Sequence, residues 1–187
     1  MSSLVFALTC AGCATQDPQE RITGSGGTLI RYSSQQITVD MNDKQREVLA
    51  ALRDREFSTT SPPKGLEAVA AALKTDGYDQ IDTETDTGLV RAEKREVLVP
   101  KWRAMLRGVL KSKIGILPAK PDHQTTTAMV TVKENGKGIL IRARFERTIW
   151  DSNGDSKKNV LIDEQTYTSF FSAVGQLLKS SGAKQDQ

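Results

Sequence analysis

Between residues 57 and 182 the apolar positions switch between a helical and a strand spacing. After Pro62, apolar side chains recur at i, i+3, i+4 and i+7 as far as Leu73, which predicts a helix with one buried face. Residues 139–150 instead alternate apolar and polar side chains, as expected of a strand with one face in a core. A second helical stripe ends the segment and consists of Tyr167, Phe170, Phe171, Val174, Leu177 and Leu178. The pattern predicts a run of strands with one helix near each end.

Turn residues divide the middle of this segment into short strands. Asn135-Gly136 is a strong signal for a tight hairpin, and Gly77 is suited to ending the first helix in a left-handed conformation. The predicted strands are residues 57–61, 78–83, 89–94, 125–133, 139–150 and 160–162. Strands in this order with flanking helices predict an α+β fold, in which an antiparallel sheet carries helices packed on one face.

The chain before residue 57 is predicted to lie outside this domain. Residues 14–27 are polar and end in a Gly-Ser-Gly-Gly run, so they are expected to form a flexible linker. Residues 28–56 are treated as an N-terminal extension, with room for a short strand and for a helix that Asn42 or Asp43 would cap. The α+β domain is assigned to residues 57–182.

Residues 1–13 contain a short motif with a chemical meaning. Leu4 to Gly12 carry no charge and are too few to span a bilayer, which needs about 20 apolar residues, but they match the core of a signal peptide. The following Cys10-Ala-Gly-Cys13 resembles the lipobox of bacterial lipoproteins. The resemblance implies that the leader is removed and that Cys13 is lipidated. Because Ala14 and not Asp follows, it also implies the outer membrane, facing the periplasm.

Cys10 and Cys13 also have the C-x-x-C spacing of thiol oxidoreductases. That chemistry needs a helix N-terminus that lowers the thiol pKa, in a fold where a strand precedes the motif. Here the pair lies in an apolar leader, and removal of the leader would remove Cys10. A thiol oxidoreductase is therefore the less favoured alternative, and no enzymatic activity is expected.

The order of elements from residue 57 to residue 181 resembles small periplasmic domains of outer-membrane lipoproteins with the helix-grip architecture, of which the assembly lipoprotein BamC is an example. The resemblance depends on a helix that starts at proline and is followed by Gly77-Tyr78 and an acidic strand. It implies a non-enzymatic interaction or scaffold module of the cell envelope, with a protein partner and without a cofactor. A shared fold confers no activity by itself.

Residues 97–121 form an insert with six lysine or arginine residues and no acidic residue. Apolar residues from Trp102 onward are spaced as on one face of a helix. One hypothesis is a basic amphipathic helix that contacts a membrane or a partner; its contact residues would be Lys101, Trp102, Arg103, Arg107 and Lys111. The other is an ordinary core helix. An apolar groove beside this helix would suit an alternative function, the binding of a lipid or another amphiphile.

Composition excludes several classes of protein. The 26 basic and 23 acidic residues give a net charge of only +3, so nucleic acid is not an expected partner. One histidine and two cysteines are too few for a His-triad or Cys-rich metal site. His123 is expected in an exposed loop, with the side chain of Asp122 pointing away from it. The acidic residues 76–86 and the loop 151–155 are expected to form a solvated strand edge and a hairpin turn, so no metal site is predicted.

Overall fold

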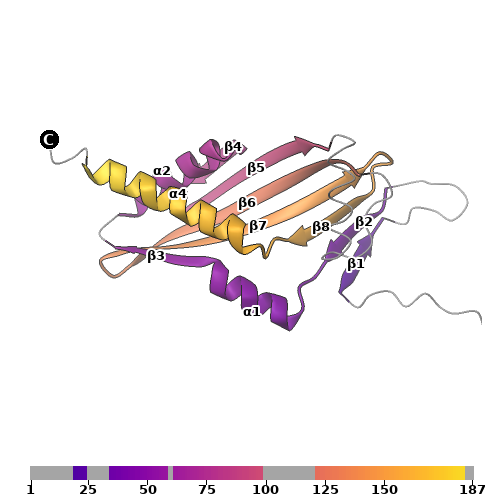
Figure 1. Cartoon of the computed structure of the whole chain (residues 1–187), viewed down its shortest axis with the longest axis horizontal. Helices are drawn as coiled ribbons and strands as arrows, with labels where there is room; N and C mark the ends of the chain where they lie inside the picture. Colours follow the sequence, from indigo (N-terminus) through magenta and orange to yellow (C-terminus); the bar gives the residue numbers. More distant parts are fainter. Residues whose placement is uncertain (1–18, 25–33, 59–60, 99–120, 184–187) are drawn as a thin grey trace, which may run out of the picture.

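The computed structural model describes residues 19–24, 34–58, 61–98 and 121–183 (Figure 1). Its elements, in chain order, are β1 (Glu20–Thr23), β2 (Gln36–Val39), α1 (Asp43–Leu52), β3 (Asp54–Ser58), α2 (Pro62–Thr75), β4 (Asp79–Glu84), β5 (Leu89–Val97), β6 (Pro121–Asn135), β7 (Gly138–Asp151), β8 (Ser156–Val160) and α4 (Glu164–Ala183).

All strands of the described residues belong to one sheet, in the order β1-β2-β8-β7-β6-β5-β4. Every pair is antiparallel except β2 with β8, which is parallel. The long strands β6 and β7 are joined at Gly136, whose φ of 62° is the left-handed conformation that the predicted hairpin requires. β3 pairs with residues 138–142 of β7 and β8 with residues 146–150, so these two short strands follow one another along the same edge of β7.

The predicted domain boundary at residue 57 is wrong. β3 and β2, which were assigned to an N-terminal extension, pair with β7 and β8 and are part of the sheet. The linker prediction for residues 14–27 is wrong for residues 20–23, which form β1 against β2. These strands contain few apolar residues. β2 and β3 are held by backbone pairing with strands 80 or more residues away, and β1 pairs in turn with β2, so a local pattern does not reveal them.

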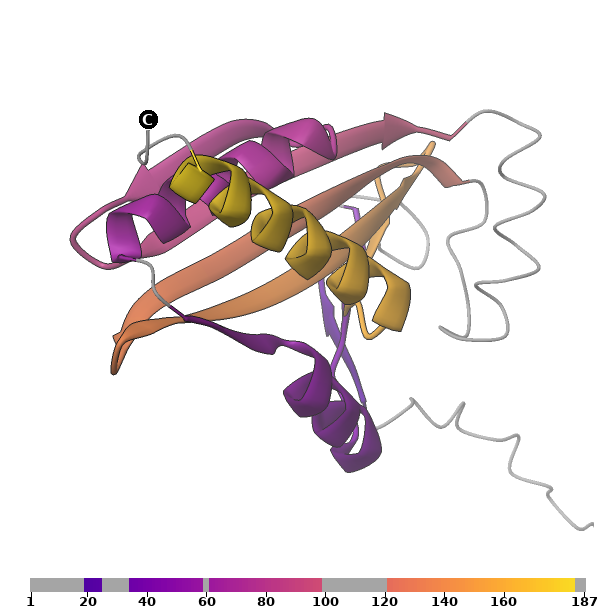
Figure 2. The same ribbon diagram turned by 60° about the vertical axis from the view of Figure 1, so that its left-hand side comes forward.

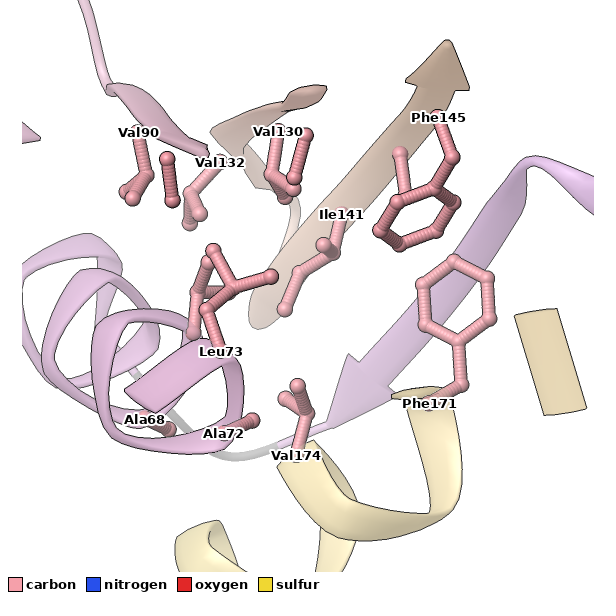
Figure 3. Close-up of a cluster of buried hydrophobic side chains, with 14 of the residues drawn as sticks. Ala68, Ala72, Leu73, Val90, Val130, Val132, Ile141, Phe145, Phe171 and Val174 are labelled. Carbon is pink, nitrogen blue, oxygen red and sulfur yellow. The ribbon is translucent and has the colours of Figure 1, made fainter. Parts of the chain in front are cut away.

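Helices α2 and α4 lie side by side on one face of the sheet (Figure 2). Even-numbered residues of β6, such as Val130, and odd-numbered residues of the first part of β7, such as Ile141, point toward these helices. They pack against Leu73 of α2 and Val174 of α4 in the buried core (Figure 3). The expected α+β class and the placement of these helices on one face are confirmed, while the sheet is mixed and not purely antiparallel.

Side chains cap the starts of two helices, one of them at the predicted residue Asn42. The side chain of Asn42 accepts a hydrogen bond from the backbone N–H of Gln45, and the Gln45 side chain accepts one from the backbone N–H of Asn42, both at 2.9 Å. At α4, a carboxylate oxygen of Asp163 accepts a bond from the backbone N–H of Thr166 at 3.1 Å. Asp163 therefore caps the last helix.

The opposite face of β5, β6 and β7, which we call the open face, points away from α2 and α4. Its residues on β6 alternate with the core residues and are half-buried; they include Thr125, Thr127, Met129 and Thr131. β5 contributes the exposed residues Arg91 and Arg95. The open face is therefore polar, as expected for the solvated side of a one-sided sheet.

Candidate functional site

The C-terminal end of α2 and the N-terminal end of α4 diverge on the helix side of the sheet (Figure 2), and residues of both helices and of the sheet line a groove there. We call it the α2–α4 groove. Its volume of about 700 Å³ lies within the range of small-molecule sites. It is lined by Ala72, Thr75, Asp76, Lys94, Phe145, Asp163, Gln165, Thr166, Ser169, Phe170 and Ala173.

The floor of the groove is aromatic. Phe145 of β7 packs edge-on against Phe170 of α4, with ring centroids 5.4 Å apart, and against Tyr167 at 5.2 Å. The hydroxyl of Tyr167 donates to the carbonyl of Leu161 at 3.0 Å, and burial raises the pKa of Tyr167 to about 12. Tyr167 therefore remains protonated at neutral pH and holds the chain that leads from β8 into α4.

Charged side chains at the rim of the groove are already used to hold the fold. Lys94 donates to the backbone carbonyl of Asp76 at 2.8 Å, just beyond the end of α2, and lies 5.8 Å from the ring of Tyr78. Asp163 caps α4. These bonds fix the two helix ends that border the groove, and they favour binding over proton transfer as a role for this site.

Arg147 lies two residues beyond Phe145 on the same side of β7, and its charge interacts with that of Asp163, which lines the groove. Its Nε is buried and makes no hydrogen bond within the described part of the chain. Burial lowers the pKa of Arg147, and the carboxylates of Glu96 and Asp163 only partly oppose this shift. The adjacent Gln124, which is 5% exposed, donates to Glu96, while its own side-chain oxygen is buried without a described partner. This end of the core is therefore polar and incompletely hydrogen-bonded.

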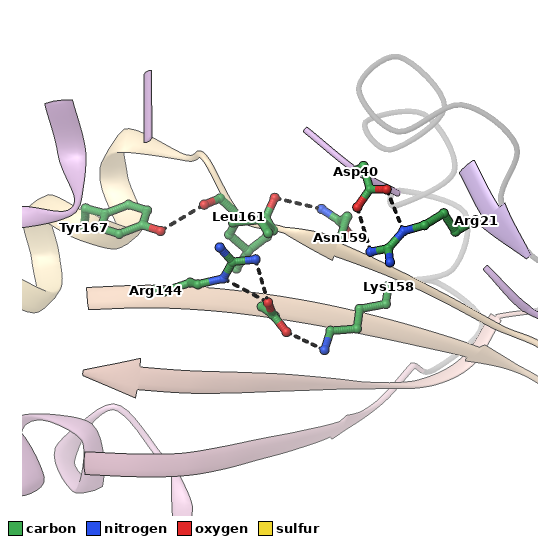
Figure 4. Close-up of polar contacts among 9 residues, drawn as sticks. Arg21, Asp40, Arg144, Lys158, Asn159, Leu161 and Tyr167 are labelled. Carbon is green, nitrogen blue, oxygen red and sulfur yellow. Dashed lines mark hydrogen bonds and ion pairs between the residues drawn. The ribbon is translucent and has the colours of Figure 1, made fainter. Parts of the chain in front are cut away.

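The open face holds one buried acidic residue, Glu146, in a network of charges. Arg144 donates to its carboxylate at 2.9 Å, and Lys158 of β8 contacts the other oxygen (Figure 4). Burial by itself raises the pKa of Glu146, but Lys158 and Arg144 outweigh it, so the pKa lies below its ordinary value. The network joins β7 to β8 and has a structural role.

His123 is not an exposed loop residue, as the sequence suggested. It belongs to β6, its side chain is 35% exposed, and its ring stacks on that of Trp150 with centroids 5.8 Å apart. A register shift at Pro121 also brings the carboxylate of Asp122 to 3.2 Å from Nδ1 of His123, so the expectation that the two side chains diverge is wrong. A regular strand would have separated them.

The acidic segments behave as predicted. Residues 79–84 form the edge strand β4, where Gln80 has a φ of 48° and the register shifts. In the hairpin turn after β7, Asp151 accepts bonds from the backbone N–H groups of Asn153 and Asp155, both at 2.8 Å. Within the ranges described above, no group of three or more metal-ligating side chains converges.

The other predicted site residues lie outside the described residues. These are the proposed lipidation site, Cys13, and the proposed contact residues Lys101, Trp102, Arg103, Arg107 and Lys111. The groove expected beside that basic helix is likewise outside them. The α2–α4 groove was not predicted, because its lining residues come from positions 72 to 173. The two aromatic residues Phe145 and Phe170 were each assigned to a core face, and their pairing was not foreseen.

Comparison with known proteins adds no assignment. No protein-family model matches the chain, and no curated protein matches its sequence. Among the helices of the described residues, none combines the length and the apolar character needed to cross a membrane.

Proposed function

We propose that the chain is a bacterial lipoprotein, attached through lipidated Cys13 to the outer membrane and facing the periplasm. The Cys10-Ala-Gly-Cys13 motif supports this more than any other observation, and the first described strand, β1, begins at Glu20, seven positions after Cys13. Signal-peptide cleavage before Cys13 would therefore remove no described strand or helix. A lipid anchor placed there would hold the complete domain close to the bilayer.

Within this proposal the domain is a non-enzymatic interaction or scaffold module of the cell envelope. The succession of α2, five strands and α4 is compatible with the helix-grip architecture that the resemblance to BamC implies. The charged side chains around the groove hold helix ends in place, which favours a binding role. The basic segment with Lys101, Trp102 and Arg103 is proposed as a further contact to the membrane or to a protein partner.

The anchor is tested by replacing Cys13 with alanine and labelling cells with radioactive palmitate. Wild-type protein is expected to carry label, whereas the C13A variant carries none and moves from the membrane fraction to the soluble fraction. C10A is the matched control, because it removes the other cysteine of the same tetrapeptide and should keep the label. Intact mass of the mature wild-type protein should show that residues 1–12 are absent.

Two results would contradict the anchor. One is equal palmitate labelling of wild type and C13A. The other is a mature chain that retains Cys10 in a disulfide with Cys13, which would favour the thiol oxidoreductase. Because cleavage before Cys13 removes one of these two thiols, a single mass spectrum separates the two hypotheses.

A second candidate function is the binding of a lipid or another amphiphile, and the α2–α4 groove favours it. The groove has an aromatic floor at Phe145 and Phe170, and polar side chains at its rim. Apolar walls with a few polar groups are typical of ligand sites. An acyl chain would contribute about 0.8 kcal/mol for each buried CH₂.

This function is tested by mass spectrometry of lipids extracted from purified protein. Ala173 lines the groove, so A173F should fill it and lower the amount of bound amphiphile by about tenfold, equivalent to about 1.4 kcal/mol. A51F is the control, since Ala51 is an exposed residue of α1 outside the groove. Wild-type protein that carries no lipid, or equal lipid in both variants, would contradict the proposal.

A further inference from the structure

The open face ends in two rows of residues that cross the sheet, and we call them the Trp150 patch. In the last row, Val97 of β5, His123 of β6 and Trp150 of β7 are direct neighbours in the strand register. From β5 to β8 the row behind it contains Arg95, Thr125, Thr148 and Lys158, and it continues with Thr38 of β2 and Arg21 of β1. An apolar and aromatic stretch thus lies at the margin of the sheet, with one cation on β5 and another on β8 in the row behind it.

The first row exposes apolar surface to solvent. Val97 is 74% exposed, more than Ile22 at 40% or Val48 at 46%, which are the other exposed large apolar residues of the described chain. Trp150 is half-buried, and its ring is held parallel to that of His123, with an angle of 12° between them. Tryptophan with one apolar and one wet side is favoured at the boundary between lipid tails and headgroups.

The second row supplies positive charge on β5 and on β8. Arg95 is exposed and forms no ion pair with any described residue, while exposed Lys158 contacts Glu146 one row further from the margin. The acidic group nearest the first row is Asp122, which contacts His123. Guanidinium and ammonium groups in such positions suit the phosphates of lipid headgroups.

The attachment of β1 limits which part of the domain can reach the bilayer. Glu20 forms an ion pair at 2.7 Å with Lys157, whose side chain is 2% exposed, and β1 pairs with β2 along its length. Gln19, the residue before β1, follows Cys13 by six positions, and a chain of that length spans at most about 20 Å. This is a much shorter tether than residues 14–27 would give.

The Trp150 patch lies within that reach, and the opposite end of the sheet does not. Glu20 is three strands and three residues from Trp150 in the register, a distance of about 17 Å. The hairpin at Gly136 is about nine residues and three strands away from Glu20 in the same register, a distance of about 33 Å. A bilayer that holds Cys13 can thus contact the patch end of the open face.

We propose that the Trp150 patch lies against the phospholipid bilayer, with Val97 and Trp150 at the level of the headgroups and with Arg95 and Lys158 bound to their phosphates. This inference depends on the proposed anchor for its geometry. It adds an orientation to the proposed function, because the α2–α4 groove then lies on the opposite face of the sheet and the β6–β7 hairpin at its far end, where both are available to ligands or partners.

The orientation is tested with the lipidated full chain in vesicles of phosphatidylethanolamine and phosphatidylglycerol. W102F leaves Trp150 as the single tryptophan, because the chain contains two. Lipids brominated near the headgroup should quench the fluorescence of Trp150, and lipids brominated at the end of the acyl chain should quench it less. Fluorescence unaffected by either lipid would overturn the proposal.

The charges are tested with the unlipidated full-length C13A chain, so that the anchor does not contribute. R95Q should lower its partition into vesicles with phosphatidylglycerol about fivefold, and R95Q with K158Q about thirtyfold, at about 1 kcal/mol for each cation. The control is K133Q with K137Q, which removes two exposed cations at the hairpin end and should leave partition unchanged. Equal losses in both pairs would indicate a nonspecific charge effect and overturn the proposal.

The two proposals fail separately. Partition of the C13A chain through the patch, together with absent palmitate labelling of the wild type, would reject the anchor and retain the patch. Labelled wild-type protein whose Trp150 is not quenched would reject the patch and retain the anchor.

Discussion

Replacement of Phe145 by alanine is expected to lower the free energy of unfolding by about 3–5 kcal/mol. Phe145 is 1% exposed and contacts three other aromatic rings, so its removal loses both apolar burial and edge-on ring contacts. The neighbouring side chains cannot readily move into the cavity that the substitution leaves, because they belong to separate positions around it. These neighbours are the rings of Tyr78, Tyr167 and Phe170.

The measurement is urea unfolding followed by circular dichroism, with the slope of the transition checked for each variant. F145L retains most of the volume and should cost less than half as much as F145A. V48A is the control: Val48 is 46% exposed, and its truncation should change stability by less than about 0.5 kcal/mol. Similar losses for F145A and V48A would mean that Phe145 is not the centre of the core that we describe.

Local sequence signals were sufficient to predict those elements whose formation depends on residues close together in the chain. The alternation of residues 139–150 predicted which side of β7 is buried, and Asn135-Gly136 predicted the hairpin that aligns β7 with β6. The helix after Pro62 and the cap at Asn42 were also readable, since each depends on residues within one or two turns.

The strand β1 and the pairing of β2 could not be predicted for the opposite reason. β1 and β2 have four residues each, and the apolar side chains of β2 are only Ile37 and Val39. Their positions depend on a parallel pairing with β8 and on the ion pair between Glu20 and Lys157, 137 residues apart. No local period records such contacts, so a strand that completes the sheet was interpreted as a linker.

The candidate sites show the same limit. Lys94, Phe145 and Asp163 line one groove because β5, β7 and α4 meet there, although each had a local structural explanation in the sequence. The contact between His123 and Asp122 depends on a register shift at the start of β6, which no residue type announced. Sequence patterns identified which face of each element is buried. Which polar residues of different elements lie close together became visible only in the folded structure.

Replacement of Gly138 by valine is expected to cost at least about 3 kcal/mol and to separate β3 from β7. A Cβ atom at Gly138 would lie 2.1 Å from the carbonyl oxygen of Phe57 and 3.0 Å from the Cα of Ser58. Both are backbone atoms of the paired strand, so no side-chain rotation relieves the overlap. The half-buried ring of Phe57, which packs on the core, would move with its strand.

Hydrogen exchange distinguishes this local separation from general unfolding, because the amides of β3 should lose protection before those of β6. G136N is the matched control two residues away in the same hairpin. Gly136 has a φ of 62°, which asparagine adopts more readily than most residues, and a Cβ there meets nothing within 4 Å. G136N should therefore keep the hydrogen-exchange protection of the β3 amides. Equal loss of this protection in G138V and G136N would show that the hairpin, and not the close approach of β3, requires glycine.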